Sequence, residues 1–108
     1  MVAPVTPEEL AQRMRAQDSR VVLLDVRELD ERETARIEPS LHIPMYEVPR
    51  RVAEIPKDRE VVVYCHTGTR SMMVAGYLES QGYSGVGNLT GGIDAWSRKV
   101  DPTVPRYG

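Results

Sequence analysis

The feature that most constrains the fold is an apolar strand that stops at the only cysteine of the chain. Residues 61–63 are three consecutive valines, a run typical of a strand buried on both faces of a parallel sheet. Cys65 follows, and a short polar loop containing Gly68 leads into a helix that we expect at residues 71–81. Open α/β sheets bind ligands at the carboxyl ends of their strands. The stretch therefore predicts an α/β fold with a site at Cys65.

This position also predicts the chemistry of the cysteine. Backbone N–H groups of such a loop point toward one spot, and the start of the following helix adds partial positive charge. Both features favour a thiolate and attract an anion. We therefore expect Cys65 to be an exposed nucleophile that acts on a small anionic substrate. The alternative is a small buried apolar residue, the usual role of a free cysteine.

A second apolar run, residues 20–26, predicts another strand covered on both faces. Asp25 and Arg27 lie at its carboxyl end, which in a parallel sheet is the edge that carries Cys65. Asp25 stands between two apolar residues, so we expect it to be partly buried and to need a partner. The charged residues that follow are interpreted as a solvated turn: Glu28, Asp30, Glu31 and Arg32.

The remaining segments predict short elements around these two strands. We expect an edge strand at residues 2–5, and then a helix that Thr6 and Glu9 begin as a capping box. A short amphipathic helix is expected at residues 47–55 and a last strand at 85–89. A Gly-Gly turn precedes the final helical turns, and the tail 101–108 is rich in proline. Several side chains are expected to pack in the interior: Met72, Met73, Tyr77, Ile93 and Trp96.

Length and composition limit the class of protein. A chain of 108 residues that is 41% hydrophobic and 28% charged fits one globular domain, residues 1–108. A net charge of −2 gives no electrostatic reason to bind nucleic acid or a membrane. One cysteine excludes an internal disulfide and a multi-thiolate zinc site, and suits a reducing cytoplasm. We expect a cytoplasmic monomer that needs no metal or other cofactor, without a signal peptide or membrane span.

Three motifs resemble the rhodanese family of sulfurtransferases, specifically its small single-domain members. The first is Cys65-x-x-Gly68-x-Arg70-Ser71, the second is the segment 23–28 (LLDVRE), and the third is the segment 91–96 (GGIDAW). The resemblance covers about residues 6–96. It implies a three-layer α/β fold, with a central, mainly parallel sheet of about five short strands and helices on both faces.

The resemblance also implies a function. Cys65 would take the outer sulfur of a small anionic donor such as thiosulfate, and the persulfide would pass it to cyanide or a thiol. It places Asp25 and Arg27 beside the loop, and we expect Arg70 to hold Asp25 in a bidentate pair. Arg70 and Arg27 could bind the donor or brace the loop, whereas ordinary loop polarity is expected of His66. The implied substrate-binding loop is His66, Thr67, Gly68, Thr69, Arg70 and Ser71.

One stretch departs from the family pattern. Small rhodaneses commonly show Gly-His-Ile and then Asn-Ile-Pro, whereas this chain has Ala-Arg-Ile at residues 35–37 and His-Ile-Pro at residues 42–44. The departure concerns the geometry of that connection and leaves the cysteine loop intact.

Three other functions remain open at this point. Cysteine phosphatases, and arsenate reductases as a weaker variant, also close a loop of N–H groups with an arginine, but their loop is one residue longer than the segment 66–69. Some rhodanese-like domains are non-catalytic binding modules, which often lack the cysteine that this chain keeps. A persulfide carrier that serves a sulfur-relay protein is the third alternative.

Overall fold

The computed structural model describes all residues, 1–108, and has one five-stranded parallel sheet. The strands run in the order β1-β5-β4-β2-β3, so β4, which precedes the cysteine, is central. The expected parallel sheet with five short strands is therefore confirmed. Their bounds are β1 Ala3–Val5, β2 Val21–Asp25, β3 Leu41–His42, β4 Glu60–Tyr64 and β5 Val86–Leu89.

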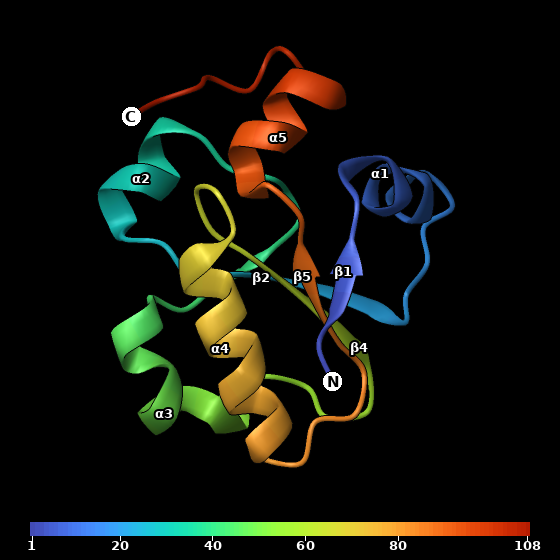
Figure 1. Cartoon of the computed structure of the whole chain (residues 1–108), viewed down its shortest axis with the longest axis vertical. Coiled ribbons are helices and arrows are strands. Elements are labelled where there is room, and N and C mark those ends of the chain that lie inside the picture. Colours follow the sequence, from blue (N-terminus) through green and yellow to red (C-terminus); the bar gives the residue numbers. More distant parts are fainter.

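Helices cover both faces of this sheet, as expected (Figure 1). One core cluster joins the sheet to α4 and to the short helix α3, and the other joins it to α1 and α5. Thr6 and Glu9 form the expected capping box at the start of α1. The helices are α1 Pro7–Arg15, α2 Leu29–Thr34, α3 Val48–Arg51, α4 Thr69–Ser80 and α5 Gly92–Lys99, with 3-10 turns at Met45–Glu47 and Val52–Glu54.

The side chains of β4 alternate between the two core clusters. Val61 and Val63 belong to the cluster on the α4 face, whereas Val62 and Tyr64 belong to the cluster on the α1 and α5 face. This alternation follows from the two-residue period of a strand. Cys65 continues the odd-numbered series and joins the cluster on the α4 face. The sheet therefore directs the sulfur toward the beginning of α4.

Three local expectations were wrong. Residues 47–55 do not form one helix, but a single α-helical turn between two 3-10 turns. The charged segment after Arg27 forms helix α2 rather than a turn; Glu28 and Asp30 are exposed as expected, whereas Glu31 and Arg32 are partly buried. Met72 and Met73 are 47% and 64% exposed, because α4 turns its other side to the sheet.

None of the helices is both long enough and apolar enough to cross a lipid bilayer.

Candidate functional site

The sulfur of Cys65 lies at the carboxyl end of β4, beneath the loop that joins this strand to α4. The backbone N–H groups of Gly68 and Ser71 donate to Sγ at 3.1 and 3.3 Å. The hydroxyl oxygen of Ser71 is 3.3 Å from the same atom. Gly68 has φ of +113°, a conformation that costs little only for glycine and that turns its N–H toward the sulfur. The loop thus places two fixed N–H donors on the sulfur, as the sequence predicted.

The expected exposure of this cysteine was wrong. Cys65 is only 1% exposed, because the loop closes over the sulfur from one side and the core lies on the other. Thr67 and Thr69 are exposed at the rim of the loop, whereas Ser71 is buried. A reagent therefore reaches the sulfur only when part of the loop or of its cover moves.

The amino end of α5 is hydrogen-bonded to the beginning of the cysteine loop. The N–H of Ile93 donates to the carbonyl of Cys65 at 2.9 Å, and the N–H of Asp94 donates to the carbonyl of His66 at 3.1 Å. Gly92 has φ of +62° and lies so close to the loop that an added Cβ would stand 2.4 Å from the carbonyl oxygen of His66. The Gly-Gly turn is therefore needed for close contact between α5 and the cysteine loop.

Replacement of Gly92 by alanine is expected to lower the free energy of unfolding by about 3 kcal/mol. The new methyl group would collide with backbone atoms, and the residue would keep a left-handed conformation that disfavours alanine. Urea denaturation measures the change. The matched control is Gly76→Ala in α4, where an added Cβ meets nothing within 4 Å and stability should rise by up to about 1 kcal/mol. Equal changes in the two variants would contradict the proposed clash.

A buried ion pair lies at the same end of the sheet as the cysteine loop, on the face opposite α4. Arg27 donates to both carboxylate oxygens of Asp25 at 2.9 Å, and neither residue is exposed. The hydroxyl of Tyr64 also donates to Asp25, at 3.0 Å, and Arg32 does so at 3.1 Å. Burial alone would raise the pKa of Asp25, but the hydrogen bonds and charge of Arg27 hold that pKa below its ordinary value. Arg27 therefore braces the site and leaves no free face for an anion.

The expected pair between Arg70 and Asp25 was wrong. Arg70 makes its bidentate pair with Glu31 of α2, at 2.7 and 2.8 Å. The physical reason is the alternation of the strands: Asp25 faces the α1 and α5 side together with Tyr64, whereas Arg70 begins α4 on the other side. Glu31 and Arg32 are thus structural partners of the site rather than residues of a solvated turn.

The proline-rich tail runs from α5 toward α2 (Figure 1) and contacts the cysteine loop at His66. The ring of Tyr107 stacks on His66 with 4.2 Å between ring centroids. Its hydroxyl donates to Glu31 at 2.8 Å and accepts from Arg27 at 2.9 Å. Burial raises the pKa of Tyr107 to about 12, so this phenol stays protonated. The tail therefore links α2, Arg27 and the loop.

Glu31 should make folding sensitive to acid. The hydrogen bonds from Arg70 lower the pKa of Glu31 to about 2, from an ordinary value of 4.5. A lowered pKa gives stability that is complete above pH 4.5 and is lost as the pH falls toward 2. The stability gap between the wild type and Glu31→Gln should thus be constant near neutral pH and close below pH 4.5. Urea denaturation at several pH values measures this gap.

The control for this prediction is Glu33→Gln, an exposed residue of the same helix. It should differ little from the wild type at any pH, because no ion pair is removed. A gap for Glu31→Gln that persists unchanged to pH 3 would contradict the pairing with Arg70.

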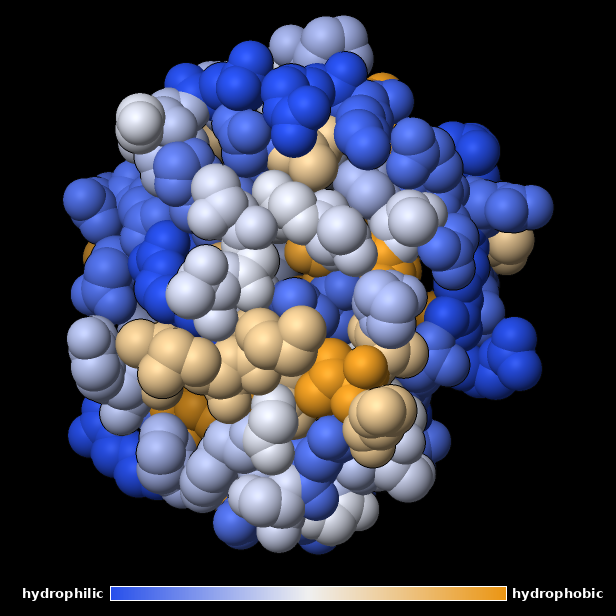
Figure 2. All heavy atoms as spheres, viewed as in Figure 1, coloured by the Kyte–Doolittle hydropathy of each residue, from blue (hydrophilic) through white to orange (hydrophobic).

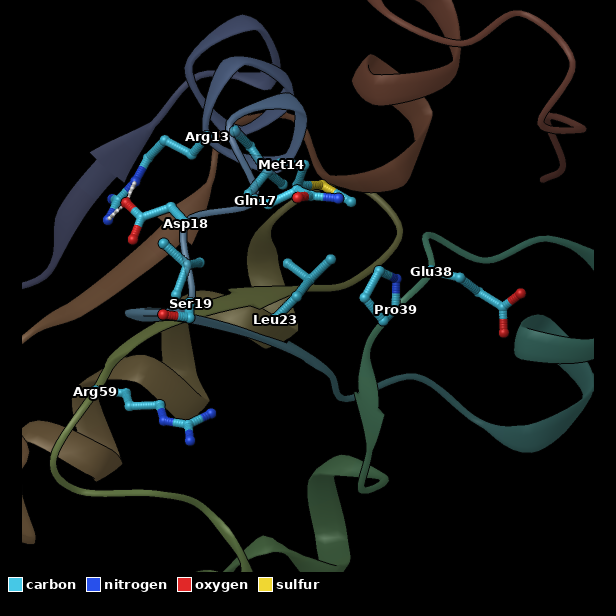
Figure 3. Close-up of a pocket in the computed structure, with 11 residues that line it drawn as sticks. Arg13, Met14, Gln17, Asp18, Ser19, Leu23, Glu38, Pro39 and Arg59 are labelled. Atoms are coloured by element: carbon cyan, nitrogen blue, oxygen red, sulfur yellow. Dashed lines mark hydrogen bonds and ion pairs between the residues drawn. The ribbon is translucent and has the colours of Figure 1, made fainter.

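Two cavities show where small molecules could be held. A hollow of about 490 Å³ adjoins the cysteine loop and is lined by His66, Thr67, Asp94, Arg106, Tyr107 and Gly108. A cavity of about 520 Å³ lies elsewhere, between the end of α1 and the segment with Pro39 (Figure 3). Its Arg13 and Asp18 point toward each other and form an ion pair, and none of its lining residues belongs to the cysteine loop. Of these two hollows, only the first is lined by residues of the cysteine loop.

Sequence reasoning missed several residues that contact this site, among them Asn88, Glu31 and Tyr107. Asn88 carried a recognisable signal, since a polar residue in the apolar strand 86–89 suggests a buried hydrogen bond. Glu31 and Tyr107 carried none. Glu31 is one of several charged residues in its segment, and Tyr107 meets Arg27, which is 80 positions away in the chain.

Comparisons with known proteins agree with this geometry. Residues 6–99 match the Rhodanese-like domain family. A sulfurtransferase of Allochromatium vinosum is 44% identical over the full length of both chains. The thiosulfate sulfurtransferase GlpE of Pseudomonas savastanoi is 34% identical over 83% of each chain. A putative sulfur carrier protein of Bacillus subtilis, YrkF, is 38% identical over 78% of this chain and 45% of its own length.

A solved structure extends the agreement to three dimensions. The rhodanese-like domain protein of Staphylococcus aureus has a TM-score of 0.83 and 27% identity, and the match covers 99% of this chain and all of that one. The family match covers the strand before the cysteine, the loop itself and α5. The chain therefore belongs to the rhodanese-like family, and its relatives include single-domain sulfurtransferases.

Proposed function

We propose that this protein is a thiosulfate sulfurtransferase that carries sulfur as a persulfide on Cys65. The observation that carries the proposal is the pair of backbone N–H groups, from Gly68 and Ser71, that converge on the sulfur of the only cysteine. Such fixed donors stabilise negative charge on sulfur without any rearrangement. The similarity to proteins named sulfurtransferases supports the same chemistry.

In the first step the thiolate of Cys65 attacks the outer sulfur of thiosulfate. A new S–S bond forms to Sγ, the S–S bond of thiosulfate breaks, and sulfite leaves with the electron pair. The outer sulfur of the resulting persulfide would then carry the negative charge, which the N–H groups of Gly68 and Ser71 are suited to bind. No proton has to move in this step once the thiolate has formed.

In the second step a thiophilic acceptor attacks the outer sulfur of the persulfide. With cyanide the product is thiocyanate, and the bonding pair returns to Sγ to regenerate the thiolate; a thiol acceptor takes the sulfur in the same way. The two displacements share one covalent intermediate, so ping-pong kinetics are expected. Because Cys65 is 1% exposed, each step requires the cover over the loop to open.

Phosphate chemistry fits this site less well. Four residues separate Cys65 from Arg70, one fewer than in cysteine phosphatases, so the loop is short for a tetrahedral phosphate. Both terminal nitrogens of Arg70 are bound to Glu31 rather than turned toward the loop. The arginine would have to leave a bidentate partner before it could bind a phosphoryl oxygen.

Mass spectrometry of the intact protein tests the proposal directly. Incubation with thiosulfate should add the mass of one sulfur atom, a reductant should remove it, and peptide mapping should place it on Cys65. A pair of assays should show thiocyanate formation from thiosulfate and cyanide, and no release from an aryl phosphate. Phosphate release without thiocyanate formation would overturn the assignment.

A persulfide carrier is the second candidate, and an exposed apolar surface on α4 favours a protein acceptor. Met73 and Tyr46 are 64% and 82% exposed, and apolar side chains gather over α4 and the segment before α3 (Figure 2). The similarity to a putative sulfur carrier points the same way. A carrier should accumulate the persulfide and turn over slowly with cyanide. Rapid turnover with cyanide would instead favour the small-molecule enzyme.

A further inference from the structure

A chain of buried polar groups lies behind the sulfur and ends at Asn88 of β5. Asn88 is 7% exposed and Ser71 is fully buried. The hydroxyl of Ser71 donates to Oδ1 of Asn88 at 2.5 Å, and Nδ2 of Asn88 donates to the carbonyl of Gly68 at 3.2 Å. The oxygen of the same hydroxyl is 3.3 Å from Sγ of Cys65. Asn88 therefore hydrogen-bonds to Ser71 and to Gly68, and it is linked to Cys65 through the Ser71 hydroxyl.

The orientation of the Asn88 amide follows from its neighbours. The carbonyl of Gly68 can only accept a hydrogen bond, so the amide nitrogen must face it and the amide oxygen must face Ser71. The flipped amide would place two oxygens against each other. An amide oxygen cannot donate, so the single hydroxyl proton of Ser71 points to Asn88.

This orientation decides what Ser71 can offer to the sulfur. With its proton used by Asn88, the hydroxyl presents a lone pair to Sγ of Cys65. A lone pair can accept the proton of a thiol, but it cannot donate to a thiolate. Of the groups in contact with Sγ, only the two backbone N–H groups then donate a hydrogen bond to the thiolate.

We propose that Asn88 is a positioning residue that turns the proton of the Ser71 hydroxyl away from Cys65, so that this hydroxyl stabilises the thiol and not the thiolate. The proposal rests on the proposed function only in taking Cys65 as the nucleophile. A thiolate without this third donor is more basic, and its intrinsic nucleophilicity is correspondingly higher. In the resting protein a larger fraction of Cys65 is then in the thiol form, which is oxidised less readily than the thiolate.

The charged groups around the loop are the same in every variant used to test this role. Arg70, on α4, is close enough to Cys65 for their charges to interact, and its guanidinium is paired with Glu31. His66 stacks on Tyr107. The carboxylate of Asp94 on α5 is bound to arginines. A change in the pH profile on substitution of Ser71 or Asn88 therefore does not come from the loss of a charged group.

The test is the pH dependence of the rate at which iodoacetamide alkylates Cys65, followed by mass spectrometry. In Ser71→Ala the thiol loses its acceptor, so the midpoint of the rate profile should move to lower pH by about 0.5 to 1 unit. If Ser71 instead donated to the thiolate, the midpoint would move to higher pH. An unchanged or raised midpoint in Ser71→Ala overturns the proposal.

A second comparison tests Asn88 itself. In the Asn88→Ala variant the hydroxyl is free to turn to the thiolate, so the midpoint should again fall. When Ser71→Ala is added to that variant, the midpoint should now rise, because Ser71 has become a donor. Ser71→Ala should thus lower the midpoint in the wild type and raise it in the Asn88→Ala variant. General loosening of the loop does not produce such a reversal. A fall in both backgrounds overturns the role of Asn88.

The control is Ser97→Ala, which removes a buried hydroxyl that donates to the carbonyl of Val104 rather than to the cysteine loop. Its midpoint should equal that of the wild type. Alkylation needs only a thiol, so these measurements succeed or fail independently of whether thiosulfate loads a persulfide.

Discussion

Replacement of Arg27 by methionine is expected to lower the free energy of unfolding by about 3 kcal/mol or more. Arg27 and Asp25 are both fully buried, so the variant leaves a buried carboxylate without its bidentate partner. Arg32 and Tyr64 still donate to Asp25, so the expected loss is at the lower end for a broken buried pair. Urea denaturation at neutral pH measures the change.

Two further variants separate the ion pair from other effects of the substitution. Arg59→Met removes an exposed arginine and should change stability by no more than about 0.5 kcal/mol. The double variant Asp25→Asn/Arg27→Met removes both charges and should be more stable than the sum of its single variants indicates. Additive losses would mean that the two side chains are not coupled, contrary to their geometry.

The same pair shows what the sequence could predict. The apolar runs in β2 and β4 predicted two central parallel strands, and their shared direction placed Asp25 and Cys65 at one edge of the sheet. Burial of Asp25 followed from its apolar neighbours in the chain. These predictions hold because they depend on strand geometry and on the cost of burying apolar and charged groups, both of which act locally.

The identity of the partners required more than local reasoning. Arg70 was the expected partner of Asp25, although the two-residue period of a strand places Asp25 and Tyr64 on the face opposite α4. Alternation along β2 and β4 is a property of the sequence pattern, and it is enough to exclude this pair. The true partner of Arg70, Glu31, could not be predicted, because the position of α2 depends on how an irregular segment packs.

The burial of the Cys65 thiol could not be predicted from the sequence, because it too depends on how distant segments pack. A strand end predicts access to solvent, but here the loop closes on the sulfur and the tail lies over the loop. Residues 101–108 are outside the segment that matches the family, and a proline-rich composition says nothing about where a tail lies. The contacts of Tyr107 with His66, Arg27 and Glu31 decide its course.

Replacement of Cys65 by serine is expected to reduce thiocyanate formation from thiosulfate and cyanide by at least about a thousandfold. The hydroxyl of serine is scarcely ionised at neutral pH, and the chain has no second thiol to accept sulfur. Thiosulfate should add no sulfur mass to this variant, whereas Ser97→Ala, which changes a buried side chain away from the loop, should load normally. The two variants should unfold cooperatively, which excludes loss of the fold as the cause. Undiminished turnover by Cys65→Ser would mean that this cysteine has only the packing role of an ordinary buried thiol.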